Sequence, residues 1–278
     1  MRVHVAFTPD EAASAPTGIV VDVVRATSTI AQALAAGYER VLCVPELEQA
    51  RALRAELADS VVGGERDAVR IDGFDAGASP REFLEPRAAT LILSTTNGTR
   101  TIVTAAERCE TVLIGSLLNL EAVVRAAAGR GEDVAVVCAG YKGAFAFDDA
   151  YCAGRIVQAL AGDRTDAAVA AALLAAAYPN PLDGLNARTY GPPGLEEDIR
   201  FCARESVLES VPRFAGMRGP VPSARLASVC CPTAIPARRS ALPVTGSAGA
   251  AISEDIRGPV PSARFACVSC PAAMPARR

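Results

Sequence analysis

Two stretches of the chain carry hydroxyl, arginine and acidic side chains directly after hydrophobic runs, an arrangement suited to an anionic ligand. In the first, VVDVVRATST (20–29), the apolar run delivers Asp22 and Arg25. Three hydroxyl residues then open a predicted helix: Thr27, Ser28 and Thr29. Free N–H groups at a helix start favour an anion, and the planar arginine fork matches phosphate or sulfonate. Because Asp22 would repel that anion, a bridging cation is expected. A capped helix with an Asp–Arg ion pair is the alternative interpretation.

The second stretch, LILSTTNGTR (91–100), repeats this pattern with another hydrophobic run that ends in polar residues and a helix start. Its candidate ligand-binding residues are Thr95, Thr96, Asn97, Gly98, Thr99 and Arg100. Asn and Gly tolerate left-handed backbone and let a ligand approach the chain closely. A well-capped strand-to-helix junction explains the same residues without a ligand. No GxxxxGK[ST] phosphate-binding loop occurs in the sequence.

Acidic residues follow other predicted strands. A polar loop after residue 62 contains Glu65 and Asp75, and the paired acids Asp148 and Asp149 begin a predicted helix. Carboxylate oxygens are the ligands that Mg²⁺ prefers, so we predict a Mg²⁺ site formed by Asp22, Glu65, Asp75 and Asp148. Solvent-facing loop acids and helix caps are the alternatives. Lys142, the one lysine, either contacts an anionic group or reaches solvent.

These residues lie between alternating short apolar runs and Ala-rich amphipathic stretches. The sequence predicts strands at 3–7, 18–24, 40–44, 60–63, 90–94, 111–115 and 133–138. It predicts helices at 27–36, 46–58, 98–106, 120–129, 149–160, 166–176 and 195–205. Continuous apolar runs such as LILS and VAVVC suit strands buried on both faces, so we predict an α/β fold with a mostly parallel sheet between helix layers. Ligands bind at the carboxyl ends of strands in such sheets.

Composition favours a soluble cytoplasmic protein. Half of the 278 residues are hydrophobic and 21% are charged, and no apolar run reaches the roughly 18 residues of a membrane helix. The first residues predict a strand and lack the apolar core of a secretory signal. Five of the nine cysteines are widely spaced in the body and are expected to be buried free thiols: Cys43, Cys109, Cys138, Cys152 and Cys202. We expect no membrane partner, and the sequence leaves a homo-oligomer open.

The chain changes character near residue 215. The segment 215–278 is rich in Pro, Arg, Ser and Ala, and it contains two copies of a 22-residue repeat, at 218–239 and 257–278. Its eight arginines and two acids give a charge of +6, which leaves −9 for residues 1–214. Regular proline spacing opposes helices and central strands, so we predict a folded domain at 1–214 and a disordered tail at 215–278. The acidic body argues against a nucleic-acid partner.

The body resembles the 2-phosphosulfolactate phosphatase family. Matching stretches are VVDVVRATSTI (20–30), GGER (63–66), GFDAGASP (73–80), LSTTNGTR (93–100), IGSLLN (114–119), CAG (138–140) and FDDAYCAGRIV (147–157), with DIRFCARESVLESVPRF (198–214) at the end. They occur in the family's order and span almost all of 1–214. The resemblance implies Mg²⁺-dependent conversion of 2-phospho-3-sulfolactate to 3-sulfolactate and phosphate, a step linked to coenzyme M synthesis. Ala78 departs from the family's usual Asn, which puts substrate choice in question.

The resulting hypothesis is a Mg²⁺-dependent phosphatase of a small anionic substrate. Asp22, Arg25 and Asp148 are the predicted catalytic residues, with water as the attacking group and one carboxylate to orient it. A covalent route through Ser or Thr stays open. The alternatives are a phosphatase of another small phosphorylated carboxylic acid, and a non-catalytic anion-binding protein on the same scaffold.

Overall fold

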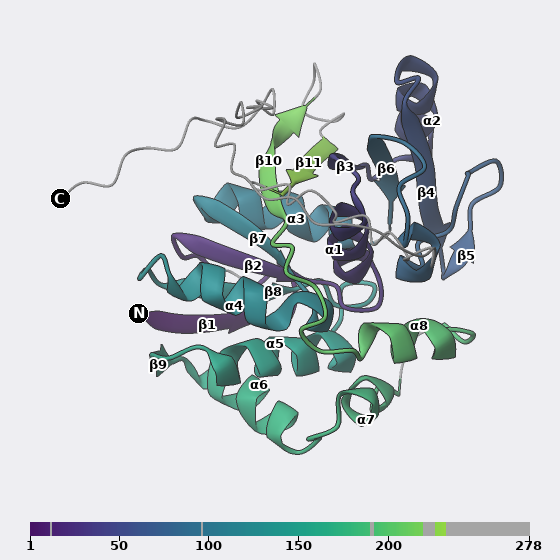
Figure 1. Cartoon of the computed structure of the whole chain (residues 1–278). Coiled ribbons are helices and arrows are strands. Elements are labelled where there is room, and N and C mark those ends of the chain that lie inside the picture. Colours follow the sequence, from purple (N-terminus) through teal and green to yellow (C-terminus); the bar gives the residue numbers. More distant parts are fainter. Residues whose placement is uncertain (12, 96, 190–191, 219–225, 232–278) are drawn as a thin grey trace, which may run out of the picture. The chain divides into compact units, whose positions relative to one another are not determined.

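The computed structural model describes residues 1–11, 13–95, 97–189, 192–218 and 226–231, and it confirms the predicted α/β class (Figure 1). All seven predicted strands are present: β1 (Arg2–Ala6), β2 (Thr17–Val21), β3 (Arg40–Cys43), β4 (Ser60–Arg66), β6 (Thr90–Ser94), β7 (Thr111–Gly115) and β8 (Val134–Cys138). The predicted helices are present as α1 (Ala26–Ala36), α2 (Leu47–Glu56), α3 (Gly98–Arg108), α4 (Leu120–Ala128), α5 (Phe147–Ala159), α6 (Asp166–Ala176) and α8 (Glu196–Cys202).

Several short elements add to the predicted set. They are β5 (Val69–Arg70), β9 (Asp163–Arg164), helix α7 (Pro181–Asn186), the 3₁₀ turns η1 (Pro80–Phe83) and η2 (Leu117–Asn119), and the strands β10 (Arg213–Arg218) and β11 (Leu226–Cys230). Helix α7 begins with Asn180, whose side chain accepts N–H bonds from the first turn, followed by a proline. The two-residue strands and the 3₁₀ turns are too short to give a periodic signal in the sequence.

The sheet has the strand order β5-β4-β6-β3-β11-β10-β7-β2-β8-β1-β9. On one side of β10 and β11, strands β4, β6 and β3 pair in parallel, and on the other side β7, β2, β8, β1 and β9 do the same. The two parallel groups are joined by β10 and β11, which pair antiparallel with each other and with their outer neighbours. The sheet is therefore mostly parallel, as predicted.

Strand β11 lies beyond residue 214, where the sequence predicts that the folded domain ends. This strand lies within the segment expected to lack regular structure, yet it pairs with β3 over Ala227, Ser228 and Val229. The reason is local, because the five residues of β11 contain no proline and each can supply its N–H to a ladder. The prediction of disorder for 232–278 lies outside the described residues.

Strand residues alternate between two packed faces of the sheet. Ile19 and Val21 of β2 face a core built with α4, α5 and α6, whereas Val20 between them faces a core built with α1 and α3. In the other parallel group, Leu42 belongs to a third cluster under α2. Helices on both faces leave the strand ends as the places where polar side chains meet solvent.

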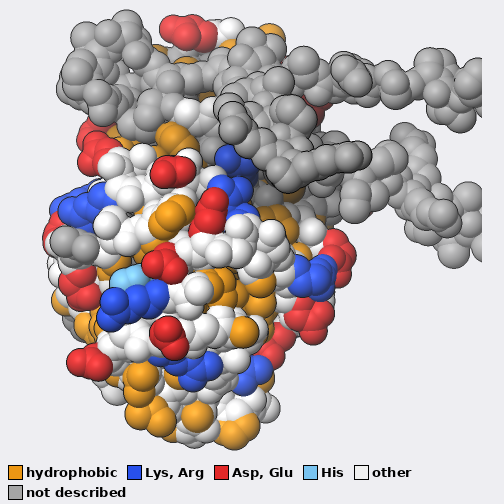
Figure 2. All heavy atoms as spheres, turned by 90° about the vertical axis from the view of Figure 1, so that its left-hand side faces the viewer, with side chains coloured by type: hydrophobic (Ala, Val, Ile, Leu, Met, Phe, Trp, Pro, Cys, Tyr) orange, Lys and Arg blue, Asp and Glu red, His pale blue; other side chains and the backbone are white. Residues whose placement is uncertain are grey.

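The described residues contain no helix of the length and apolar character required to cross a membrane. On the face shown in Figure 2, acidic and basic side chains lie interspersed, and neither sign gathers into one patch. The five cysteines of the body are buried free thiols, which confirms that prediction. Burial raises the pKa of Cys43 and of Cys202 to about 12, so both remain protonated at neutral pH.

Candidate active site

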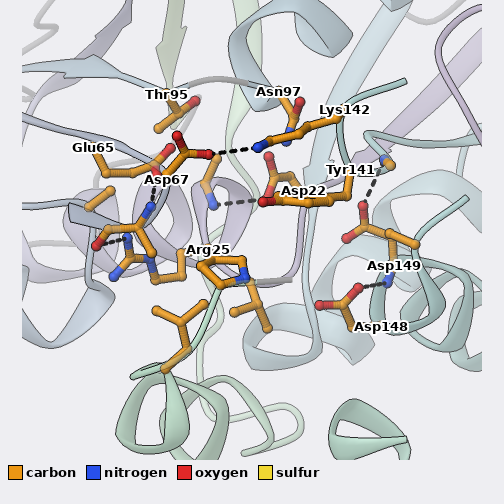
Figure 3. A pocket seen from close by; sticks show the side chains of 18 of the residues that line it. Asp22, Arg25, Glu65, Asp67, Thr95, Asn97, Tyr141, Lys142, Asp148 and Asp149 are labelled. Atoms are coloured by element: carbon orange, nitrogen blue, oxygen red, sulfur yellow. Dashed lines mark hydrogen bonds and ion pairs between the residues drawn. The ribbon is translucent and has the colours of Figure 1, made fainter. Parts of the chain in front are cut away.

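A pocket lies where the carboxyl ends of several parallel strands meet (Figure 3). Asp22 follows β2, Thr95 follows β6, and Gly140 follows β8, while Glu65 lies near the end of β4. Five acids among the described residues line the pocket: Asp22, Glu65, Asp67, Asp148 and Asp149. Three cations line it as well: Arg25, Lys142 and Arg188. The excess of acid favours a cation in addition to an anionic ligand.

Asp22 stands at the centre of this cluster of acids. Its Oδ1 accepts a hydrogen bond from the backbone N–H of Ala26, 3.3 Å away, in the first turn of α1. Burial raises the pKa of Asp22 to about 7, and the charges of Glu65 and Asp148 add to that rise. The charges of Glu65 and Asp148 therefore both oppose ionisation of Asp22, and a bound cation would relieve this repulsion.

Asp148 and Asp149 occupy the first turn of α5 and have different partners. Asp149 is 4% exposed and accepts N–H bonds from Val23 (2.8 Å) and Gly140 (3.0 Å), so it ties together the ends of β2 and β8. Asp148 faces Arg188, with Oδ2 3.5 Å from Nη1. Burial raises the pKa of Asp148, although Arg188 opposes the rise. Asp149 thus holds the ends of β2 and β8 together, whereas Oδ2 of Asp148 faces the guanidinium group of Arg188.

Arg25 is held in place by a carboxylate far away in the sequence. Its Nη1 lies 2.8 Å from Oδ2 of Asp198 in α8, and both side chains are about nine-tenths buried. Ser79 donates to the other oxygen of Asp198, and Nη2 of Arg25 donates to the carbonyl of Ala68 at 3.3 Å. A guanidinium has five N–H donors, so others remain for a ligand in the pocket. The ion pair considered for Arg25 exists, but with Asp198 rather than Asp22.

The mouth of the pocket carries a second ion pair. Nζ of Lys142, in the loop between β8 and α5, lies 3.0 Å from Oδ1 of Asp67, in the turn between β4 and β5. Figure 3 shows this pair joining the two sides of the pocket. Glu65 accepts the backbone N–H of Ala68 at 2.6 Å, which closes the same turn.

The predicted hydroxyl residues divide between the pocket and the body of the protein. Thr95 and Asn97 line the pocket. Thr99 lies 3.5 Å from Thr95, oxygen to oxygen, and is buried behind it. Gly98 allows α3 to approach Asp22, because a side-chain carbon there would lie 2.8 Å from Oδ2 of Asp22.

The hydroxyls at the start of α1 are engaged elsewhere. Thr27 donates to the carbonyl of Asp22, Ser28 to that of Val23, and Thr29 to that of Ala78. All three side chains are fully buried, and they lie outside the set of described residues that line the pocket. The sequence predicts that these hydroxyls bind a ligand. In the structure they instead bond to carbonyl groups and fix the strand-to-helix turn that carries Asp22 and Arg25.

Two further predicted residues lie away from the pocket. Asp75, a predicted metal ligand, accepts the N–H of Val62 at 2.9 Å and pairs with Arg54 on α2 at 3.3 Å. Arg100 is exposed and pairs with Asp10 at 2.9 Å, because the turn of α3 directs it outward. Thr96 lies outside the described residues. Asp75 is thus separated from the other three predicted metal ligands, Asp22, Glu65 and Asp148.

The structure adds residues that sequence patterns did not single out as part of a site. Arg188 lies two residues after the end of α7 and belongs to no motif that the sequence analysis singled out. Asp67 lies in the turn between β4 and β5 and carries no motif of its own. Asp198 belongs to the closing segment of the family resemblance, which gives it no role.

A family model and several relatives match this chain, and all of them carry the same family name. The family model for 2-phosphosulpholactate phosphatase matches residues 5–216. A protein of Thermus thermophilus is 38% identical over 231 residues, covering 79% of this chain and 97% of its own length. Proteins of Clostridium acetobutylicum and Thermotoga maritima are 35% and 36% identical, covering 71% and 76% of this chain and 89% and 94% of their own. All three relatives are named probable 2-phosphosulfolactate phosphatases.

Proposed function

The chain belongs to the 2-phosphosulpholactate phosphatase family, and on that basis we propose that it hydrolyses 2-phospho-3-sulfolactate to 3-sulfolactate and phosphate with Mg²⁺. The observation that carries the proposal is the meeting of Asp22, Glu65 and Asp148 with Arg25 in one strand-end pocket. Carboxylates beside a guanidinium are the combination that a metal-assisted phosphoryl site requires.

The donor set is compatible with Mg²⁺ in particular. Among the described residues, no group of three or more acidic, His or Cys side chains is placed so that it could hold a metal ion by itself. Mg²⁺ usually takes only one or two protein carboxylates and completes its shell with water and substrate oxygens. Asp22, with Glu65 or Asp148, would supply that number. Burial is the main cause of the raised pKa of Asp22, and the charges of Glu65 and Asp148, which a cation would neutralise, add to it. Mg²⁺ in this position would neutralise charge on the phosphoryl oxygens.

The protein's own groups then have distinct tasks. Arg25, fixed by Asp198, binds phosphoryl oxygens through N–H groups that the ion pair leaves available. Asp148 orients the attacking water and accepts its proton, since burial raises the pKa of this carboxyl and makes it a better base. Water adds to phosphorus as the bond to the ester oxygen breaks, and that oxygen leaves with the electron pair and takes up a proton. Preorganised charge of this kind is the main source of catalysis in phosphoryl transfer.

Phosphate release from a panel of phosphorylated acids tests the proposal. The panel includes 2-phosphosulfolactate, 2-phospholactate and phosphoglycolate, each assayed with Mg²⁺ and then with excess chelator. We expect chelator-sensitive release with 2-phosphosulfolactate preferred. Release that survives the chelator would contradict the metal role, and folded protein that releases no phosphate would overturn the activity.

One observation favours a second candidate, a phosphatase of another small phosphorylated acid. Ala78 lines the pocket at the position where the resemblance leads one to expect Asn. An alanine side chain offers no hydrogen bond to a ligand, so the selection between related acids can differ. Preference for a phosphorylated acid other than 2-phosphosulfolactate in the same panel would support this candidate, and Ala78→Asn should then shift the preference back.

A further inference from the structure

Three cations among the described residues line the pocket, and each one is paired with a carboxylate. The pairs are Arg25 with Asp198 (2.8 Å), Arg188 with Asp148 (3.5 Å), and Lys142 with Asp67 (3.0 Å). An anionic substrate must therefore share a cation with its carboxylate or displace that carboxylate. The three pairs differ greatly in how easily this can happen.

Burial separates the pairs. The side chains of Arg25 and Asp198 are 10% and 8% exposed, whereas those of Lys142 and Asp67 are 53% and 72% exposed. Separating a buried pair leaves an uncompensated charge in a medium that cannot solvate it. An exposed pair contributes little, because water screens it and solvates both partners after they separate. Of the three cations, Lys142 can thus leave its carboxylate and pair with a ligand at the lowest cost in free energy.

The position of this pair suits contact with a group at the outer end of a substrate. Asp67 and Lys142 come from loops on different sides of the pocket, and both line it (Figure 3). Nζ of Lys142 lies 5.3 Å from the centre of the Tyr141 ring, and this cation–π contact favours keeping the ammonium group near the mouth. Asp22 and Arg25 instead follow the end of strand β2.

We propose that Lys142 is a specificity-determining residue that binds a second acidic group of the substrate, the carboxylate or sulfonate beside the phosphate ester. In the ligand-free protein, Asp67 pairs with Lys142. When the substrate binds, its acidic group replaces Asp67 as the partner of Lys142. The inference rests on the proposed function, since it names which residue of that pocket distinguishes a diacid ester from a simple phosphate ester.

The test compares Lys142→Gln with Lys142→Arg as the matched charged control. The substrates are 2-phosphosulfolactate, 2-phospholactate, which lacks the sulfonate, and p-nitrophenyl phosphate, which lacks both acids. For Lys142→Gln, the ratio of kcat/KM for 2-phosphosulfolactate to that for p-nitrophenyl phosphate should fall about tenfold, mostly through KM. Lys142→Arg should keep most of the ratio. A loss shared with 2-phospholactate would assign the contact to the carboxylate, and a loss confined to 2-phosphosulfolactate would assign it to the sulfonate.

Asp67→Asn provides the readout that a structural role would not produce. Because the variant removes the competitor for Lys142, KM for 2-phosphosulfolactate should fall, and the gain should vanish in the Lys142→Gln background. A pair that only stabilised the loops would instead give weaker binding in both single variants. That result, or an unchanged substrate ratio in Lys142→Gln, would overturn the inference.

Binding of 3-sulfolactate, measured by calorimetry, separates this inference from the proposed function. The ligand carries both acids and no phosphate, so its affinity does not depend on turnover. If the wild-type protein hydrolyses nothing, the proposed activity fails, yet weaker 3-sulfolactate binding by Lys142→Gln would still support the role of Lys142. Equal binding by both proteins, or no binding by the wild type, would refute that role.

Discussion

Replacing Gly98 by alanine would press the start of α3 against Asp22. A side-chain carbon at this position would lie 2.5 Å from Cβ of Ala26 and 2.8 Å from Oδ2 of Asp22. Carbon atoms in contact prefer about 3.5–4.0 Å, so Ala26 or the helix must move by about 1 Å. Ala26 is fixed in the first turn of α1 and is 3% exposed, which leaves the Asp22 carboxylate as the more movable neighbour.

The two consequences of Gly98→Ala differ in size. Overpacking of this kind costs about 1–3 kcal/mol, and the better helix propensity of alanine offsets about 1 kcal/mol. The net loss of about 0–2 kcal/mol should lower the melting temperature by at most roughly 8 °C. A catalytic group displaced by about 1 Å can cost about 100-fold in rate. We therefore expect kcat/KM for 2-phosphosulfolactate to fall about 100-fold in a protein that remains folded.

Gly115→Ala is the matched control for this prediction. A side-chain carbon there would lie 2.6 Å from Cγ2 of Ile19, in the sheet and outside the set of described residues that line the pocket. It should destabilise the fold by a similar amount and leave kcat/KM near that of the wild type. Phosphate-release kinetics give kcat/KM for the two variants, and melting curves give their stability. Wild-type kcat/KM in Gly98→Ala, or an equal loss in both variants, would refute the reasoning.

Three further changes test the site and the sheet. Burial raises the pKa of Asp22 from 3.8 to about 7, so between these pH values the metal-free folded state keeps a proton that the unfolded state has lost. The free energy of unfolding should therefore fall as pH rises through this range, and this group contributes at most about 1.4 kcal/mol per pH unit. Urea unfolding of Asp22→Asn should show a shallower fall with pH. Parallel pH curves for the variant and the wild type would contradict the raised pKa. Asp198→Asn leaves the buried Arg25 charge without its partner and should lower the free energy of unfolding by about 3–5 kcal/mol, and an unchanged melting temperature would argue against a stabilising pair. Deleting 232–278 should preserve kcat/KM, whereas deleting 219–278 also removes β11 and should lower the melting temperature; equal melting of the two truncated proteins would show that β11 contributes no stability.

Much of the fold follows from sequence periodicity. Buried parallel strands are short and continuously apolar, so LILS and VAVVC identify β6 and β8 without knowledge of their neighbours. The strand-end rule also locates Asp22, Glu65 and Thr95 correctly at the pocket. It succeeds because parallel strands share one direction, so residues that follow them emerge at the same edge.

The rule fails where position depends on the turn of a helix or a loop. Asp75 and Arg100 belong to the same polar stretches as the pocket residues, but each pairs with a surface charge instead. The hydroxyls of Thr27, Ser28 and Thr29 bond to nearby carbonyl groups, which residue type alone does not reveal.

The sequence by itself determined the α/β class, the polar strand ends and the family to which the chain belongs. Tertiary structure alone decided that Asp198 holds Arg25 across 173 positions of the chain, that Arg188 faces Asp148, and that β11 enters the sheet beside β3. The physical reason is that apolar periodicity is a local property of the chain. Ion pairs and strand insertion instead depend on which distant surfaces pack together.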